Sequence, residues 1–123
     1  MAKNEVIYRT LSSNIKTTSV LSSTPVQIFS AGANGSKILS MYFLVGSSAE
    51  SCTITYNNGT DQVLLSGISS SNSAIVDVLA AITPLPKTGA GQPYFNVNSG
   101  DVIKLTNNTA TANATIVVVA EDY

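Results

Sequence analysis

The pattern of apolar and polar positions predicts short β-strands separated by turns. Residues 50–56 alternate between apolar and polar side chains, which is the period of a strand with one buried face. Residues 57–60, Asn-Asn-Gly-Thr, give the strongest hairpin signal, because Asn and Gly accept the positive φ angles of a tight turn. We therefore expect a hairpin that joins 50–56 to a strand over 62–69.

The most apolar strand is expected at 37–46, where both faces carry apolar side chains. Such a strand is either central in a covered sheet or faces a partner. The tight turn at 98–101 predicts that strands 94–97 and 102–107 pair with each other. Further strands are expected at 6–11, 26–30 and 114–120.

Three segments have mixed signals. Residues 14–23 are polar and β-branched, which indicates a connector, with or without an edge strand. Residues 74–82 combine helical spacing with β-branched side chains, so we expect a short strand that runs into one helical turn before Pro84. Residues 85–93 are a loop rich in Pro and Gly.

These elements predict one domain over 1–123 and an all-β fold. About eight strands, at most one short helical turn and no linker are typical of an antiparallel β-sandwich of jelly-roll or Ig-like type. Residues 1–12 are either an extended N-terminal arm or the first strand.

The composition shows an unusually low content of charged residues. Charged residues make up 11% of the chain, against about 25% in ordinary soluble domains. Polarity comes instead from 17 Ser, 13 Thr and 11 Asn, and the net charge is −1. Copies of the chain therefore repel one another weakly and can pack densely. Thr-rich strands and Ser/Asn-rich turns explain the same composition equally well.

The chain carries few groups suited to catalysis or metal binding. It has no histidine, which excludes Ser-His-Asp and Cys-His systems, and its glycines match no phosphate-binding motif. Cys52 is the single cysteine, and alternation places it with Ile54 on a buried face. Asp61 and Asp101 fall in turns, where capping is a better explanation than calcium binding. We expect no enzyme activity, no cofactor and no metal.

Several classes of partner are also disfavoured. The six basic residues are spread evenly, so no cationic face for nucleic acid is expected. No apolar run approaches the ~20 residues of a membrane helix, and residues 1–5 lack the features of a signal peptide. Sugar binding by aromatic stacking would need exposed rings. Tyr42, Tyr56 and Tyr94 are expected on strands, packed in the core with their hydroxyls at its rim.

Residues 23–38, Ser-Thr-Pro-Val-Gln-Ile-Phe-Ser-Ala-Gly-Ala-Asn-Gly-Ser-Lys-Ile, resemble a segment of small β-sandwich proteins encoded among the virion genes of tailed bacteriophages. The Leu85-Pro86 loop that leads to Tyr94 and the Val-rich last strand that ends at Asp122-Tyr123 are similar to that group too, so the resemblance covers 20–123. It implies a structural virion protein without catalytic residues, in the first place one that decorates or cements the capsid shell.

The expected partners are therefore the major capsid protein or other virion proteins, in the virion, with the chain itself as a homo-oligomer. Multivalency lets individual contacts be modest. Val6, Ile7 and Tyr8 near the N-terminus and Tyr123 at the C-terminus are the expected interface anchors. The alternative is a receptor- or carbohydrate-binding module on a tail or head fibre, or a neck or tail component.

Overall fold

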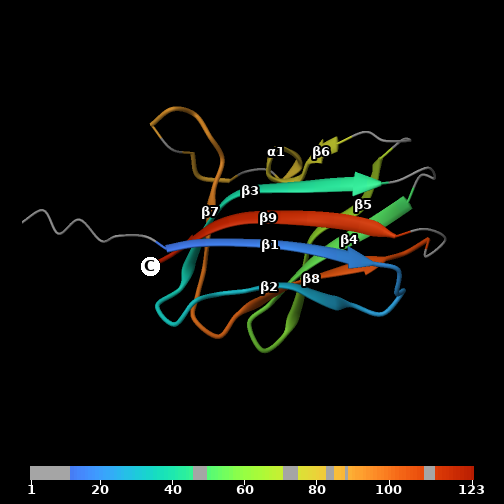
Figure 1. Ribbon diagram of the computed structural model, residues 1–123, viewed down its shortest axis with the longest axis horizontal. Coiled ribbons are helices and arrows are strands. Elements are labelled where there is room, and N and C mark those ends of the chain that lie inside the picture. Colours follow the sequence, from blue (N-terminus) through green and yellow to red (C-terminus); the bar gives the residue numbers. More distant parts are fainter. Residues whose placement is uncertain (1–11, 46–49, 71–74, 83–84, 88, 110–112) are drawn as a thin grey trace, which may run out of the picture.

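A computed structural model describes residues 12–45, 50–70, 75–82, 85–87, 89–109 and 113–123, which form two antiparallel sheets packed face to face (Figure 1). In the five-stranded sheet the order is β1-β9-β3-β6, and β7 also pairs with β3. Its strands are β1 (Ser12–Val20), β3 (Ser36–Val45), β6 (Ile75–Asp77), β7 (Phe95–Val97) and β9 (Ala114–Asp122). The four-stranded sheet has the order β2-β8-β4-β5. Its strands are β2 (Val26–Ser30), β4 (Glu50–Asn57), β5 (Asp61–Ser70) and β8 (Val102–Asn107).

The predicted fold class is confirmed, because the described part of the chain is an antiparallel β-sandwich with one helix of four residues, α1 (Val78–Ala81). The hairpin at 57–60 joins β4 to β5, with Gly59 at φ +103°. The strand that runs into a helical turn is also confirmed, as β6 followed by α1. Asp77 begins the helix, and its carboxylate accepts a hydrogen bond from the backbone N–H of Ala80 at 3.3 Å.

Of the two alternatives for residues 14–23, the structure shows the edge strand, because β1 occupies 12–20 and pairs with the whole of β9. One sequence-based prediction needs correction. The predicted pairing of 94–97 with 102–107 is wrong, because β7 pairs with β3 whereas β8 pairs with β2 and β4. The tight turn between them exists, with Gly100 at φ +84°, but it carries the chain from one sheet to the other. A turn signal indicates only that the chain reverses direction. Which strands then pair with each other depends on how their apolar faces pack in the sheets. The strand expected at 6–11 lies outside the described residues.

The core lies between the two sheets. In β8, Ile103 and Leu105 are fully buried, in the same core cluster as Ile116 and Val118 of β9 and Phe43 of β3. Burying each such side chain stabilises the fold by roughly 1.5–3 kcal/mol. Cys52 is buried in the same core, as the alternation of its strand predicts.

The most apolar strand is central but is not covered on both sides within the described residues. Strand β3 is central in its sheet, between β9 on one side and β6 and β7 on the other. Its inner face is buried, with Met41 and Phe43 at 0% exposure. Tyr42 points to the other side and is 38% exposed. Within the described residues, nothing packs over that outer side as a third layer (Figure 1).

Candidate functional site

The outer side of the five-stranded sheet has apolar side chains on four adjacent strands. Paired residues of antiparallel strands point to the same side of a sheet, so the register places outward residues in rows. One row joins Ile15 of β1 to Val119 of β9. The next joins Val117 to Tyr42, and a third brings Leu44 opposite Ile75 of β6. We call these residues the apolar outer face: Ile15, Tyr42, Leu44, Ile75, Val117 and Val119.

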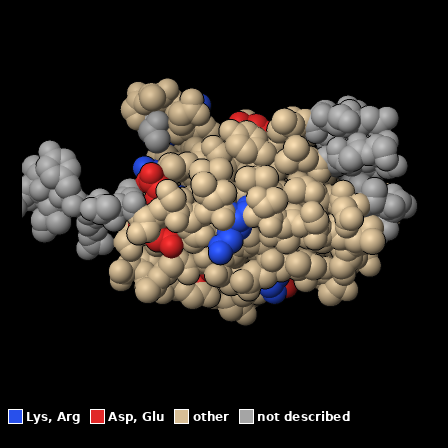
Figure 2. Space-filling model, viewed as in Figure 1, with Lys and Arg blue, Asp and Glu red and all other residues tan. Residues whose placement is uncertain are grey.

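The apolar outer face is exposed to an extent that is unusual for a sheet with one covered side. Ile15 is 60% exposed and Ile75 is 63% exposed, and they belong to the two strands at opposite edges of the sheet, β1 and β6. The outward positions of such a sheet are normally polar. Figure 2 shows that this side of the molecule carries few charged side chains. At one end of the strands, the pair Lys37 and Glu121 forms a charged margin. An apolar centre with a polar margin is the composition of a protein-binding surface.

Part of this surface has a signal in the sequence. The run Ile116-Val117-Val118-Val119 is continuously apolar, so half of its side chains must leave the core face of β9. The same reasoning identified the two apolar faces of 37–46, but it did not identify Ile15 or Ile75. Those residues join the surface only because β1 and β6 lie beside β9 and β3.

Tyr123, an expected interface anchor, lies at the corner where β9 ends. Its backbone N–H donates to the carbonyl oxygen of Gly35 at 3.1 Å, and its hydroxyl donates to Oδ1 of Asn96 at 2.6 Å. Tyr123 is 37% exposed, so the residue closes this corner and still presents a surface. Val6, Ile7 and Tyr8 lie outside the described residues. The interface role of all four residues stays a prediction.

A polar network holds the same corner together. The carboxylate of Asp122 accepts hydrogen bonds from Nδ2 of Asn14 at 2.9 Å and from Oγ of Ser36 at 2.5 Å. The Ser36 oxygen in turn accepts from the backbone N–H of Gly32 at 2.9 Å. These bonds join β1, β9, β3 and the turn at 31–35. The Asp122 carboxylate therefore has a structural role.

The two aspartates that were expected in turns, Asp61 at the start of β5 and Asp101 directly before β8, are engaged by neighbouring side chains. Asp101 accepts a hydrogen bond from the Tyr56 hydroxyl at 2.5 Å, and burial, with this bond, raises the pKa of Tyr56 above 10.0. Asp61 accepts from Nδ2 of Asn57 and lies 3.4 Å from Nζ of Lys104. The Asn57 bond is the main cause of a lowered pKa of Asp61. Within the described ranges, no group of three or more His, Cys, Asp or Glu side chains is placed to hold a metal ion.

The three tyrosines expected to pack the core differ in their positions. Tyr56 does pack against the core with its hydroxyl at the rim, as predicted. Tyr42 does not, because it belongs to the outer face. Tyr94 precedes β7, is half-buried, and has the Lys37 ammonium 4.6 Å from its ring centre.

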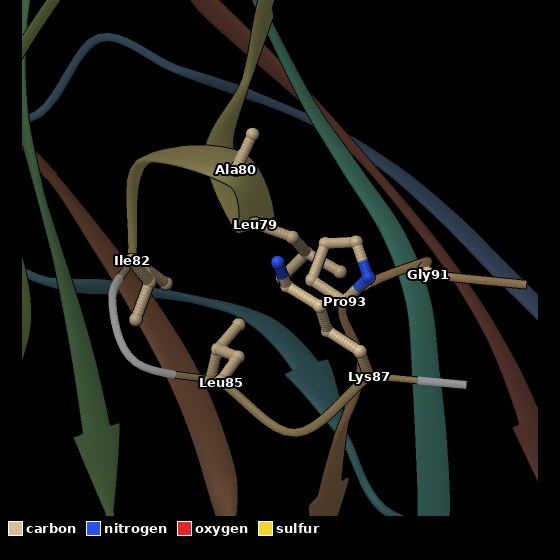
Figure 3. Close-up of a pocket in the computed structure, with 7 residues that line it drawn as sticks. All are labelled: Leu79, Ala80, Ile82, Leu85, Lys87, Gly91 and Pro93. Carbon is tan, nitrogen blue, oxygen red and sulfur yellow. The ribbon is translucent and has the colours of Figure 1, made fainter. Parts of the chain in front are cut away.

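A pocket of about 350 Å³ lies between α1 and the loop over 85–93 (Figure 3). Figure 3 shows the Lys87 side chain extending across it toward α1. The volume is at the lower end for a small-molecule site. Lys87 is the single titratable group among the described lining residues, so that lining offers no acid–base pair. The lining consists of Leu79, Ala80, Ile82, Leu85, Lys87, Gly91 and Pro93.

Comparison with known proteins does not place the chain in a family, since no family model, curated protein or solved structure matches it. Among the described residues, no helix has the length and apolar character needed to cross a membrane. The apolar outer face is therefore the candidate functional site on its own physical merits.

Proposed function

We propose that this chain is a structural protein of a bacteriophage virion, a decoration or cement protein that bridges major capsid subunits. The observation that carries the proposal is the apolar outer face, where Ile15, Tyr42 and Ile75 are exposed on one sheet. Large exposed apolar patches on soluble proteins mark interaction sites. The resemblance of residues 20–123 to small virion proteins supplies the class of partner.

Charge and valency support the same proposal. A chain with 11% charged residues and a net charge of −1 can be placed many times over one particle with little mutual repulsion. Each contact can be weak, because a bridging protein that engages two subunits at once gains effective concentration. The proposal assigns the chain no catalytic step.

The test is a measurement of the chain on particles. Particles produced from the genome that encodes the chain are purified on a density gradient, and the copy number is measured by quantitative mass spectrometry. We expect a fixed ratio to the major capsid protein. Absence from the particle fraction would contradict the proposal.

Matched substitutions then test the surface. Ile75→Lys places a charge on the apolar outer face and should reduce the copy number, because a buried unpaired ammonium is unfavourable in an interface. Val63→Lys is the control, since Val63 is 64% exposed but lies on β5 of the other sheet. An equal loss with both variants would exclude this face as the contact.

The exposure of Tyr42 favours a second candidate, a carbohydrate-binding module on a fibre. Tyr42 is paired in register with Asp77, so an aromatic face and a carboxylate lie side by side on the outer face. Binding on a glycan array that is lost in Tyr42→Ala would favour this candidate over the capsid contact.

A further inference from the structure

Strand β1 forms an edge of the five-stranded sheet with nothing paired to its outer side in the described part of the chain. Its pairing with β9 runs without interruption from Ser12 opposite Asp122 to Val20 opposite Ala114. No other backbone–backbone hydrogen bond joins residues 12–19 to the described segments. The outer N–H and C=O groups of a nine-residue strand are therefore available to another strand.

The other edges of the sandwich carry features that discourage such pairing. Strand β2 has five residues, follows Pro25 and is irregular between Gln27 and Phe29. Strand β5 has irregular pairing with β4 and contains Gly67 at φ +70°. Strands β6 and β7 have three residues each. Short, irregular or Pro-flanked edges resist association, whereas β1 is long and regular, lacks Pro and Gly, and has only the charge of Lys16 to oppose pairing.

We infer that β1 is a dimerisation edge, which pairs antiparallel with β1 of a second copy about a twofold axis at Ile15. In this register Ile15 lies opposite Ile15 of the second copy, and Asn14 lies opposite Lys16. The two five-stranded sheets become one continuous sheet. The apolar outer faces of both copies then lie on the same side and meet at the paired Ile15 residues.

Charge disfavours the neighbouring register with its axis at Lys16. Lys16 is the single charged residue of β1, and an axis at Lys16 would bring two ammonium groups directly opposite each other, which is destabilising. An axis at Ile15 places Lys16 opposite Asn14, whose amide is bound to the Asp122 carboxylate at 2.9 Å. The ammonium then shares a sheet face with the carboxylate of the other copy. An axis at Thr17 would instead place Ile15 opposite Ser19 and lose the apolar pair.

A second copy fits this edge because the strand is complementary to itself in the chosen register, and because the net charge of −1 opposes its approach only weakly. The inference goes beyond the proposed capsid contact. It depends on the backbone edge of β1, and it is tested on purified protein without particles, so either idea can fail alone.

The first test measures the mass of the full chain in solution over a range of concentrations, by sedimentation velocity. We expect a monomer–dimer equilibrium whose Kd rises by about tenfold or more in Ile15→Lys, because two added charges would face each other. Val63→Lys is the matched control and should leave the Kd unchanged. A chain that stays monomeric at every concentration would overturn the inference. So would an Ile75→Lys variant that weakens the dimer as strongly as Ile15→Lys, because that result indicates stacking of outer faces.

The second test traps the register. Directly opposed residues of antiparallel strands have Cβ atoms about 4.5–5.5 Å apart, close enough for an Ile15→Cys disulfide between copies. Oxidation should yield a covalent dimer of Ile15→Cys and none of Val63→Cys, while Cys52 is buried in both. Circular dichroism confirms that each variant is folded. A folded Ile15→Cys protein that forms no covalent dimer would contradict a twofold axis at this residue.

Discussion

The Asp122 carboxylate is the residue-scale contact on which the corner of the sandwich depends. It binds Asn14 of β1 and Ser36 of β3 from its position at the end of β9, so three strands meet at one side chain. Gly32 passes close to it. A Cβ atom at position 32 would lie 2.8 Å from Cγ of Asp122, which is closer than real Cβ contacts allow.

Gly32→Ala should therefore lower the free energy of unfolding by about 1–3 kcal/mol, because the Asp122 side chain must move away from its partners. Urea denaturation measures the change. Gly89→Ala is the control, since nothing lies within 4 Å of a Cβ at that position and the change should stay within about 0.5 kcal/mol. Equal free energies of unfolding for the two variants would show that the Asp122 side chain moves aside without a loss of stability.

Tyr56 links stability to pH at the same scale. Its hydroxyl donates to Asp101 and accepts from the backbone N–H of Asn98 at 3.3 Å. The pKa of Tyr56 is raised in the folded state, so the unfolded chain loses this proton at lower pH than the folded chain does. The contribution to stability is thus complete below the ordinary value of 10.0 and is lost as the pH rises through the folded pKa.

Tyr56→Phe should lower the free energy of unfolding at neutral pH by about 0.5–1.5 kcal/mol, through loss of the hydrogen bonds of the hydroxyl. Above pH 10 the gap between wild type and variant should narrow, because the wild type alone loses the contribution of Tyr56. Chemical denaturation on both sides of that pH measures the gap. A difference in unfolding free energy between wild type and variant that is constant with pH would show that the Tyr56 hydroxyl has the same pKa in the folded and unfolded states.

At the scale of elements, the crossing from β1 to β2 between the sheets depends on Asn107, a buried polar residue of β8. Its Nδ2 donates to the carbonyl oxygen of Val20 at 3.0 Å, and its backbone N–H donates to Ser22 at 3.1 Å. The end of one sheet's edge strand is thereby attached to the other sheet. Since a buried carbonyl without a donor is costly, this contact stabilises the path of the crossing.

Asn107→Ala should lower the free energy of unfolding by about 1–3 kcal/mol, measured by thermal or urea denaturation. Asn108→Ala is a matched control on the neighbouring residue. Asn108 is exposed and its Nδ2 donates to Oγ1 of Thr53 at 2.9 Å, where water can replace it, so its loss should be smaller. A larger loss at Asn108 than at Asn107 would contradict this account of the crossing.

At the scale of the whole molecule, the sandwich is asymmetric. The outer face of the five-stranded sheet carries apolar side chains on four strands, with polar ones such as Thr17 and Asp77 among them, and α1 lies beside the sheet and leaves that face uncovered (Figure 1). Strand β1, a long and regular edge strand whose one protective feature is the charge of Lys16, borders the same sheet. The proposed capsid contact and the inferred dimer therefore use adjoining parts of one sheet, the face and the edge.

Local signals predicted much of this architecture. Strand β2 was expected over the same residues, the β4–β5 hairpin follows from Gly59 in its turn, and the Asp77 cap lies where a strand passes into a helical turn. Each of these signals acts between residues close in sequence. The partner of β7 was missed because the turn at 98–101 indicates only that the chain reverses.

The candidate site was predictable only in part. The apolar residues of 37–46 on both sides of a strand indicated either a covered central position or a partner, and Tyr42 shows that one side is open within the described residues. Ile15 gave no comparable signal, since it is a single apolar residue in a polar segment. It became part of a surface through its neighbour Val119 in β9.

The amino-acid sequence by itself determined most of the strands, the inward side of most of them and the scarcity of charge, because alternation and turn chemistry are local properties. Only the tertiary structure decided which strands share a sheet, which apolar side stays uncovered and which edge stays open. The physical reason is that backbone N–H and C=O groups are the same in every strand. Strand partners are therefore chosen by the packing of distant side chains in a common core.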